Sequence, residues 1–138
     1  MGSRNERYLQ KSELAKERIA NIREWHLGGN DLKSRLATYK AFQEASEAVM
    51  DICAMLCKDS GKAVKDDYEN IEKLRVMKII TEETSSSLRE MNGMRNRIIH
   101  EYNGFSYKMF SGNVERLIKE AENFLGVVDA WQKKSSRK

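Results

Sequence analysis

The stretch YKMFSGNVERLIKEAENFLGVVDAWQK, residues 107–133, decides the fold. Its apolar residues recur in alternating steps of four and three, and they are Phe110, Val114, Leu117, Ala121, Phe124, Val128 and Trp131. This heptad spacing places all of them on one side of a helix. Because a helix with one continuous apolar side must cover it, we expect this segment to pack lengthwise against other helices, as in an antiparallel bundle.

Similar spacing predicts further helices before this one. Residues 4–26 form an amphipathic segment that ends at Gly28 and Gly29, and Asn30 or Asp31 can cap the segment that follows. That second helix is expected over residues 32–58 as the central core helix. Its apolar stripe consists of Leu32, Leu36, Tyr39, Phe42, Ala45, Val49, Ile52 and Leu56.

Two shorter helices are expected between the second and the last. Asp66 or Asp67 can open the first of them, which breaks near Ile80. Thr81 then begins an imperfect capping box in which Thr84 takes the place of the usual Glu or Gln.

Composition supports the same fold class. The chain has 138 residues, no proline and many good helix formers. We therefore predict an all-α protein, an antiparallel up-down bundle of four to five helices, formed by a single domain over residues 1–138. Residues 1–4 and 133–138 are expected to be flexible.

Charge and hydropathy set broad limits on function. The net charge of +4 and the pI near 9.1 weakly favour a polyanionic partner. The sequence has no run of about 20 apolar residues and no apolar core of a secretory signal, so we expect a cytoplasmic protein that does not enter a membrane. Long amphipathic helices without a short helix-turn-helix pattern argue against sequence-specific DNA binding.

The two cysteines are expected to be structural. Cys53 and Cys57 lie four residues apart within an apolar helical pattern, and no histidine stands at zinc-ligand spacing. Buried free thiols are therefore the better interpretation, and no metal or other cofactor is predicted.

The segment MRNRIIHEY, residues 94–102, holds the residues best suited to chemistry. Arg95 carries a permanent charge, His100 brings an imidazole that can take up or give back a proton, and Tyr102 can donate a hydrogen bond, accept one or be modified. Cleavage of RNA through its own 2′-hydroxyl needs a base, a cation to stabilise the crowded phosphorane, and an acid for the leaving oxygen. His100 and Arg95 could fill these roles without a metal, and Asn96 could orient the imidazole.

Helical geometry attaches a condition to this hypothesis. Arg95 and His100 are about 140° apart on an ideal helix. They can act on one phosphate only if the helix ends or distorts near His100, or if a second subunit supplies the missing partner. The alternative is a purely structural role for these residues. Basic side chains would then lie at the negative end of the helix dipole, and the tyrosine would be a hydrogen-bonded core residue.

Three carboxylates share one side of the expected second helix. Glu44, Glu47 and Asp51 stand at helical spacing where the helix becomes more apolar, so they need basic partners. Glu47 and Asp51 could pair with Arg95 or Arg97 and so fix the motif.

The motif resembles the Arg-x4-His-x-Tyr signature of HEPN-domain proteins, specifically the HepT family of HepT/MNT toxin-antitoxin systems. The similarity extends to residues 41–51, which resemble that family's acidic second helix, and to residues 74–81 and 93–102. Met94, where relatives often have an aromatic residue, is a mild departure.

The resemblance implies a helical bundle that forms a homodimer with both motifs in one cleft, and a metal-independent endoribonuclease acting on RNA. Arg95 and His100 match the catalytic residues, with Asn96, Tyr102, Glu47 and Asp51 in support. It also implies a minimal nucleotidyltransferase (MNT) antitoxin that can transfer AMP to the motif tyrosine, here Tyr102. The alternative function is a non-catalytic HEPN module that binds a nucleotidyltransferase or a nucleotide.

Overall fold

Five helices make up the described part of the chain in the computed structural model, which describes residues 3–100 and 105–136. They are α1 (Arg4–Leu27), α2 (Leu32–Asp59), α3 (Asp67–Val76), α4 (Glu82–His100) and α5 (Tyr107–Ser136). The described residues contain no strand, which confirms the predicted all-α class. The helix positions also agree with the expected ones, and α5 continues slightly past its expected end at Lys133.

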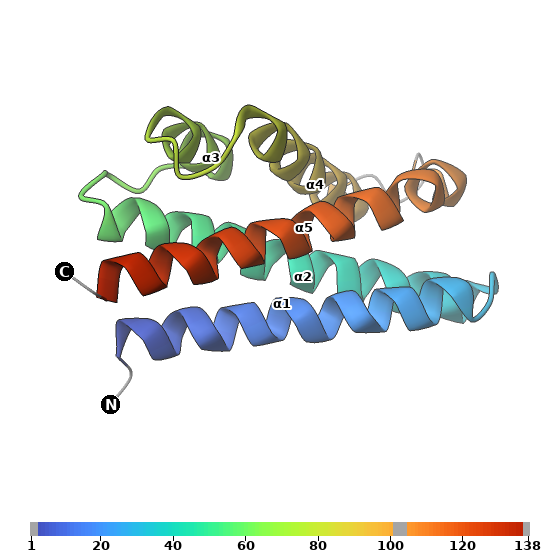
Figure 1. Ribbon diagram of the computed structural model, residues 1–138. Helices are drawn as coiled ribbons and strands as arrows, with labels where there is room; N and C mark the ends of the chain where they lie inside the picture. Colours follow the sequence, from blue (N-terminus) through green and yellow to red (C-terminus); the bar gives the residue numbers. More distant parts are fainter. Residues whose placement is uncertain (1–2, 101–104, 137–138) are drawn as a thin grey trace.

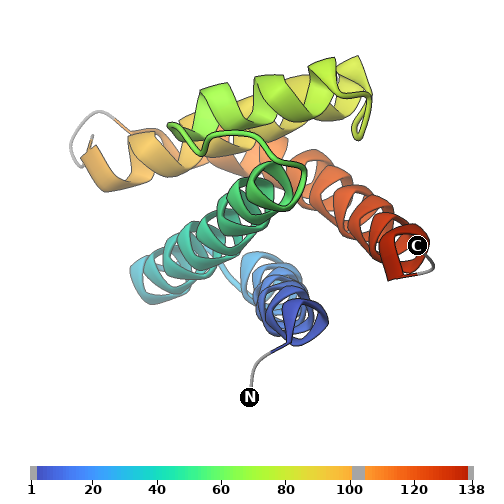
Figure 2. The same cartoon turned by 90° about the vertical axis from the view of Figure 1, so that its left-hand side faces the viewer.

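The helices form two groups. Figure 1 shows α1, α2 and α5 lying lengthwise beside one another. The chain direction of α1 is antiparallel to that of α2 and α5. Figure 2 shows that α3 and α4 lie together across one side of α2 and α5. The turn between α1 and α2 and the first turn of α5 lie at the same end of the molecule, opposite the described ends of the chain (Figure 1).

The heptad stripe of α5 is the inner side of that helix, as predicted. Six of its seven residues, Phe110 to Val128, are buried, and Trp131 is half-buried against the core. Near the start of α5 the core is aromatic, because Phe110 packs against the rings of Tyr39, Phe42, Phe105 and Tyr107. Centroid separations of 5.2 to 6.1 Å and the tilted or edge-on ring angles are the favoured aromatic geometry.

The predicted stripe of α2 is wrong at its first turns. Phe42 to Leu56 are buried, but Leu32 is 62% and Leu36 is 56% exposed. Apolar spacing identifies one face of a helix, but it does not say how far along that face a neighbour extends. No described element covers these two leucines.

Side-chain caps explain where the helices begin. Ser3 forms a capping box with Glu6, which starts α1. Asp31 accepts from the amide of Ser34, and Asp66 accepts from the amide of Glu69, so these two aspartates are the caps of α2 and α3. Thr81 accepts from the Thr84 amide at 3.1 Å, as the sequence predicts for α4.

The end of α3 depends on a residue in the left-handed region. Lys78 has φ of 62°, and its amide donates to the Arg75 carbonyl while the Ile79 amide donates to the Leu74 carbonyl. This is the Schellman pattern, in which glycine is the preferred residue because it has no Cβ to strain.

We therefore expect Lys78→Gly to raise the free energy of unfolding by about 0.5 to 1 kcal/mol, since the relief of strain exceeds the entropy that glycine adds to the unfolded chain. Urea unfolding followed by circular dichroism measures it. The control is Lys119→Gly, on an exposed helical position of α5, which should lower stability by about 1 kcal/mol. A loss at Lys78 equal to that at Lys119 would rule out strain at this turn.

Candidate functional site

Arg95 lies in a half-enclosed position between three helices. It follows the buried Met94 on α4, and its side chain is 19% exposed. Its Nη1 lies 3.5 Å from Oε2 of Glu47 on α2, and its Nη2 lies 3.6 Å from Oδ2 of Asp67 on α3. Met50 and Asp51 complete the described lining of the pocket around it.

The two carboxylates hold the guanidinium loosely. Both separations are longer than the 2.7 to 2.9 Å or so of a strong charge-assisted hydrogen bond. The Nε of Arg95 is buried and has no hydrogen-bond partner among the described residues. Arg95 is thus oriented from two sides but retains hydrogen-bonding capacity for an incoming anion.

Asp67 is a partner of Arg95 that the sequence does not single out. In the pattern it stands only as an alternative cap for α3, a role that Asp66 takes instead. Burial raises the pKa of Asp67, the neighbouring Arg95 opposes this rise, and the nearby Asp51 and Asp66 add to it. The charge of Arg95 thus favours the ionised form of this carboxylate, which couples the two side chains.

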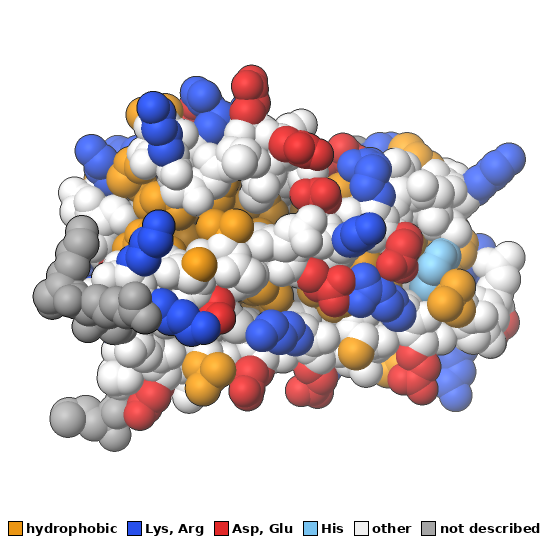
Figure 3. Space-filling model, viewed as in Figure 1, with side chains coloured by type: hydrophobic (Ala, Val, Ile, Leu, Met, Phe, Trp, Pro, Cys, Tyr) orange, Lys and Arg blue, Asp and Glu red, His pale blue; other side chains and the backbone are white. Residues whose placement is uncertain are grey.

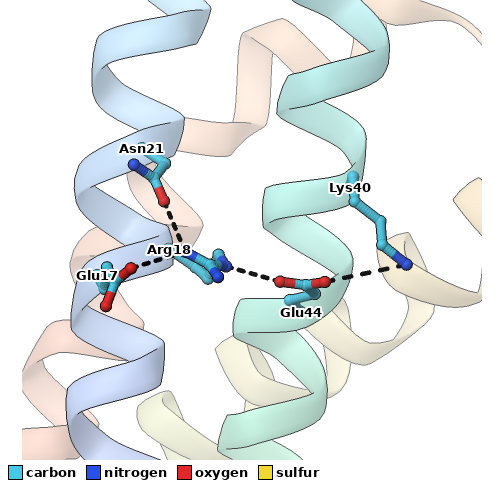
Figure 4. Close-up of polar contacts among 5 residues, drawn as sticks. All are labelled: Glu17, Arg18, Asn21, Lys40 and Glu44. Carbon is cyan, nitrogen blue, oxygen red and sulfur yellow. Dashed lines mark hydrogen bonds and ion pairs between the residues drawn. The ribbon is translucent and has the colours of Figure 1, made fainter.

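Each of the three carboxylates of α2 has a basic partner on another helix. Glu44 accepts from Nε of Arg18 on α1 at 2.6 Å, and Figure 4 shows this contact together with the neighbouring Lys40. Asp51 pairs with Lys11 of α1 at 2.8 Å, whereas Glu47 alone of the three reaches Arg95. Two of these ion pairs thus join α2 to α1, and the third joins α2 to Arg95 of the motif.

His100 is the last residue of α4 and is exposed. The helix is regular from Arg95 to His100, so distortion within this segment does not bring the two side chains onto one face. Asn96, on the same side as His100, is half-buried. Tyr102 lies outside the described residues.

The end of α4 is tied to the start of α5. The guanidinium of Arg97 lies over the ring of Phe105, 5.8 Å from its centroid, and Nη1 lies 3.3 Å from Sδ of Met109. These contacts hold the last turn of α4, and with it His100, against the aromatic part of the core.

The cysteines are buried and free, as predicted. Burial raises the pKa of both thiols, and the Cys57 thiol donates to the backbone carbonyl of Asn70. Among residues 3–100 and 105–136, no group of three or more His, Cys, Asp or Glu side chains is arranged to hold a metal ion.

The face of the molecule in Figure 3 agrees with the modest net charge of the chain. On the face that Figure 3 shows, basic and acidic side chains are interleaved without a broad field of one sign. None of the described helices combines the length and the apolar character of a membrane span.

Comparisons with known proteins identify relatives over most of the chain. The family described as "Ribonuclease HepT-like" matches residues 8–128. Two proteins of Archaeoglobus fulgidus, each named "Putative RNase", are similar in sequence. One is 45% identical over 72% of this chain and 74% of its own length, and the other is 37% identical over 83% and 84%.

Solved structures share the fold. A tri-AMPylated HEPN toxin of Shewanella oneidensis in complex with MNT antitoxin superposes with a TM-score of 0.84 at 21% identity, covering 90% of this chain and 97% of that one. A toxin-antitoxin structure with AMP-PNP gives a TM-score of 0.83 at 20% identity, covering 88% and 97%.

Proposed function

We propose, for a chain that belongs to the HepT-like ribonuclease family, that its endoribonuclease activity needs no metal ion and is carried by Arg95 and His100 of α4. The observation that carries this proposal is the placement of Arg95. A permanent cation is held between Glu47 and Asp67 in a half-enclosed pocket, with one nitrogen unpaired among the described residues, on the helix that ends in an exposed imidazole.

The chemistry follows from these two groups. The imidazole of His100 takes the proton of the 2′-hydroxyl, whose oxygen then attacks the adjacent phosphorus. The guanidinium of Arg95 stabilises the negative charge that gathers on the phosphorane oxygens. The P–O5′ bond breaks, the leaving oxygen takes up a proton from water, and the cleaved strand ends in a 2′,3′-cyclic phosphate. The imidazolium of His100 then gives its proton back to the solvent. Asn96 orients the imidazole, and Tyr102 assists.

A homodimer completes the site. Because Arg95 points toward α2 and α3 while His100 leaves α4 on another side, one chain does not present both groups to one phosphate. A second copy related by a two-fold axis can place its own His100 beside the first copy's Arg95, and the same operation generates a second site.

The partner in this proposal is an MNT antitoxin that neutralises a toxin by transferring AMP to Tyr102. Support comes from structural neighbours that are toxin-antitoxin complexes, one of them tri-AMPylated. A nucleotidyl group on the motif tyrosine would add negative charge and bulk close to where the RNA phosphate must bind.

RNA cleavage in EDTA tests the proposed function. Incubation of the purified protein with single-stranded RNA should give fragments with 2′,3′-cyclic phosphate ends. A strand of 2′-O-methyl RNA is the control, and it should stay intact because it lacks the attacking hydroxyl. Intact unmodified RNA, together with tight binding of a nucleotidyltransferase encoded by the adjacent reading frame, would instead support the non-catalytic module.

A further inference from the structure

A second pocket lies away from Arg95, where α1 ends and α2 and α5 begin. It has a volume of about 840 Å³, and its lining includes His26, Arg35, Tyr107, Lys108 and Ser111. None of the described residues that line it carries a carboxylate. One guanidinium, one lysine and one imidazole therefore share a cavity without a negative side chain in the described lining.

The polar groups of this pocket are held in place. Nδ1 of His26 lies 3.0 Å from the Tyr107 hydroxyl, and Nε2 lies 3.5 Å from Oγ of Ser111. The guanidinium of Arg35 lies over the Tyr107 ring, 5.7 Å from its centroid. Tyr107 thus orients both His26 and Arg35 from the first turn of α5.

Arg35 lacks the acidic partner that several other half-buried arginines have. Arg18 and Arg23 pair with carboxylates of neighbouring helices, and Arg95 pairs with Glu47 and Asp67. Arg35 has no ion pair within the described residues, and its Nε is buried without a hydrogen-bond partner there. A half-buried cation with an unpaired donor in a cavity favours a bound anion.

We propose that this pocket binds a phosphate group of the RNA strand, at a distance from the bond that is cut. Arg35 and Lys108 supply the charge, and Ser111 supplies a hydrogen bond. An RNA chain fits better than an enclosed small ligand because Lys108 and the turn residues Gly29 and Asn30 at the rim are exposed. The inference rests on the proposed action on RNA.

The pocket and the catalytic motif share an end of the bundle. The Tyr39 ring packs against both Phe105, on which Arg97 of α4 lies, and Tyr107, which lines the pocket. A strand whose scissile phosphate reaches the last turn of α4 can therefore continue across the start of α5. The pocket anchors the flanking backbone and adds affinity without reading sequence.

Binding of a fluorescent 2′-O-methyl RNA, which cannot be cleaved, tests the inference. By anisotropy, Arg35→Gln should raise Kd about tenfold and reduce the slope of log Kd against log salt concentration by about 0.7, the value for one phosphate contact on a single strand. Arg35→Lys should retain most of the affinity. Lys33→Gln removes an equal charge from an exposed position outside the pocket lining and is the matched control, expected to change Kd less than twofold or so.

The outcomes separate this inference from the proposed function. Equal affinities of Arg35→Gln and Lys33→Gln would overturn it, even if the parent protein cuts RNA. If the parent protein cuts no RNA but Arg35→Gln still binds RNA more weakly, the role of the pocket in RNA binding is supported. The catalytic role of Arg95 and His100 is then rejected. Should Arg35→Gln fail to fold, Lys108→Gln at the exposed rim provides the same comparison. Inorganic phosphate should displace RNA from the parent protein at concentrations that leave RNA bound to Arg35→Gln. This result would confirm that the pocket recognises the phosphate group.

Discussion

Replacing His100 by alanine is expected to lower the rate of RNA cleavage by at least about 100-fold, because the reaction loses the group that moves the 2′-hydroxyl proton. Arg95→Ala should cost a similar factor, about 100- to 1,000-fold, through loss of the charge that stabilises the phosphorane. Single-turnover cleavage of a defined RNA in EDTA measures both. Because His100 is exposed at the end of α4, its removal should leave the melting temperature nearly unchanged.

The matched control for Arg95 is Arg116→Ala. Arg116 on α5 is also paired with a carboxylate, that of Glu90 on α4, but it lies outside the motif. Its removal should leave cleavage within about twofold of the parent, since exposed ion pairs contribute little to stability. Cleavage by His100→Ala at the parental rate would refute the assignment of the base. If Arg95→Ala and Arg116→Ala lower the cleavage rate equally, the effect is not specific to Arg95, and its assignment as the stabilising cation is refuted.

Mixing the two inactive variants tests whether the site is shared between chains. In a mixed dimer of Arg95→Ala and His100→Ala, one of the two composite sites keeps both an intact Arg95 and an intact His100. Random exchange of subunits should therefore restore about a quarter of the parental activity. If each chain instead built its own site, no activity would return.

The sequence predicted most of the helices because their information is local. Heptad spacing in α5 and the caps Asp31, Asp66 and Thr81 act within a few residues of chain, so helix positions followed directly. Leu32 shows where local information ends. Its spacing is that of a core residue, but the element needed to cover it is absent from the described chain.

In the candidate site, too, some features could be predicted from local sequence and others depend on tertiary packing. The motif residues were identified by their types and by family resemblance, whereas the pairing of Arg95 with Asp67 required the packing of α3 against α4. A cap candidate and an ion-pair partner look alike in sequence, since both are an aspartate at the start of a helix. The pocket around Arg35 was missed for a similar reason, because its lining comes from three segments that spacing cannot join.

Phe110→Ala is expected to lower the free energy of unfolding by about 3 to 5 kcal/mol. Phe110 is fully buried and packs against four aromatic rings, so truncation leaves a cavity between the start of α5 and α2. This loss is a large share of the roughly 5 to 15 kcal/mol that stabilises a typical domain, and the variant should melt well below the parent. Urea unfolding followed by circular dichroism measures the change.

The matched control for Phe110→Ala is Leu32→Ala. Heptad and helical spacing rank Leu32 with Phe110 as core, but Leu32 is exposed in the single chain, so its truncation should change stability by only about 0.5 kcal/mol or less. A small loss at Phe110 would contradict the aromatic core. A large loss at Leu32 that grows with protein concentration would mean that a second copy covers the first turns of α2, because only association makes stability depend on concentration.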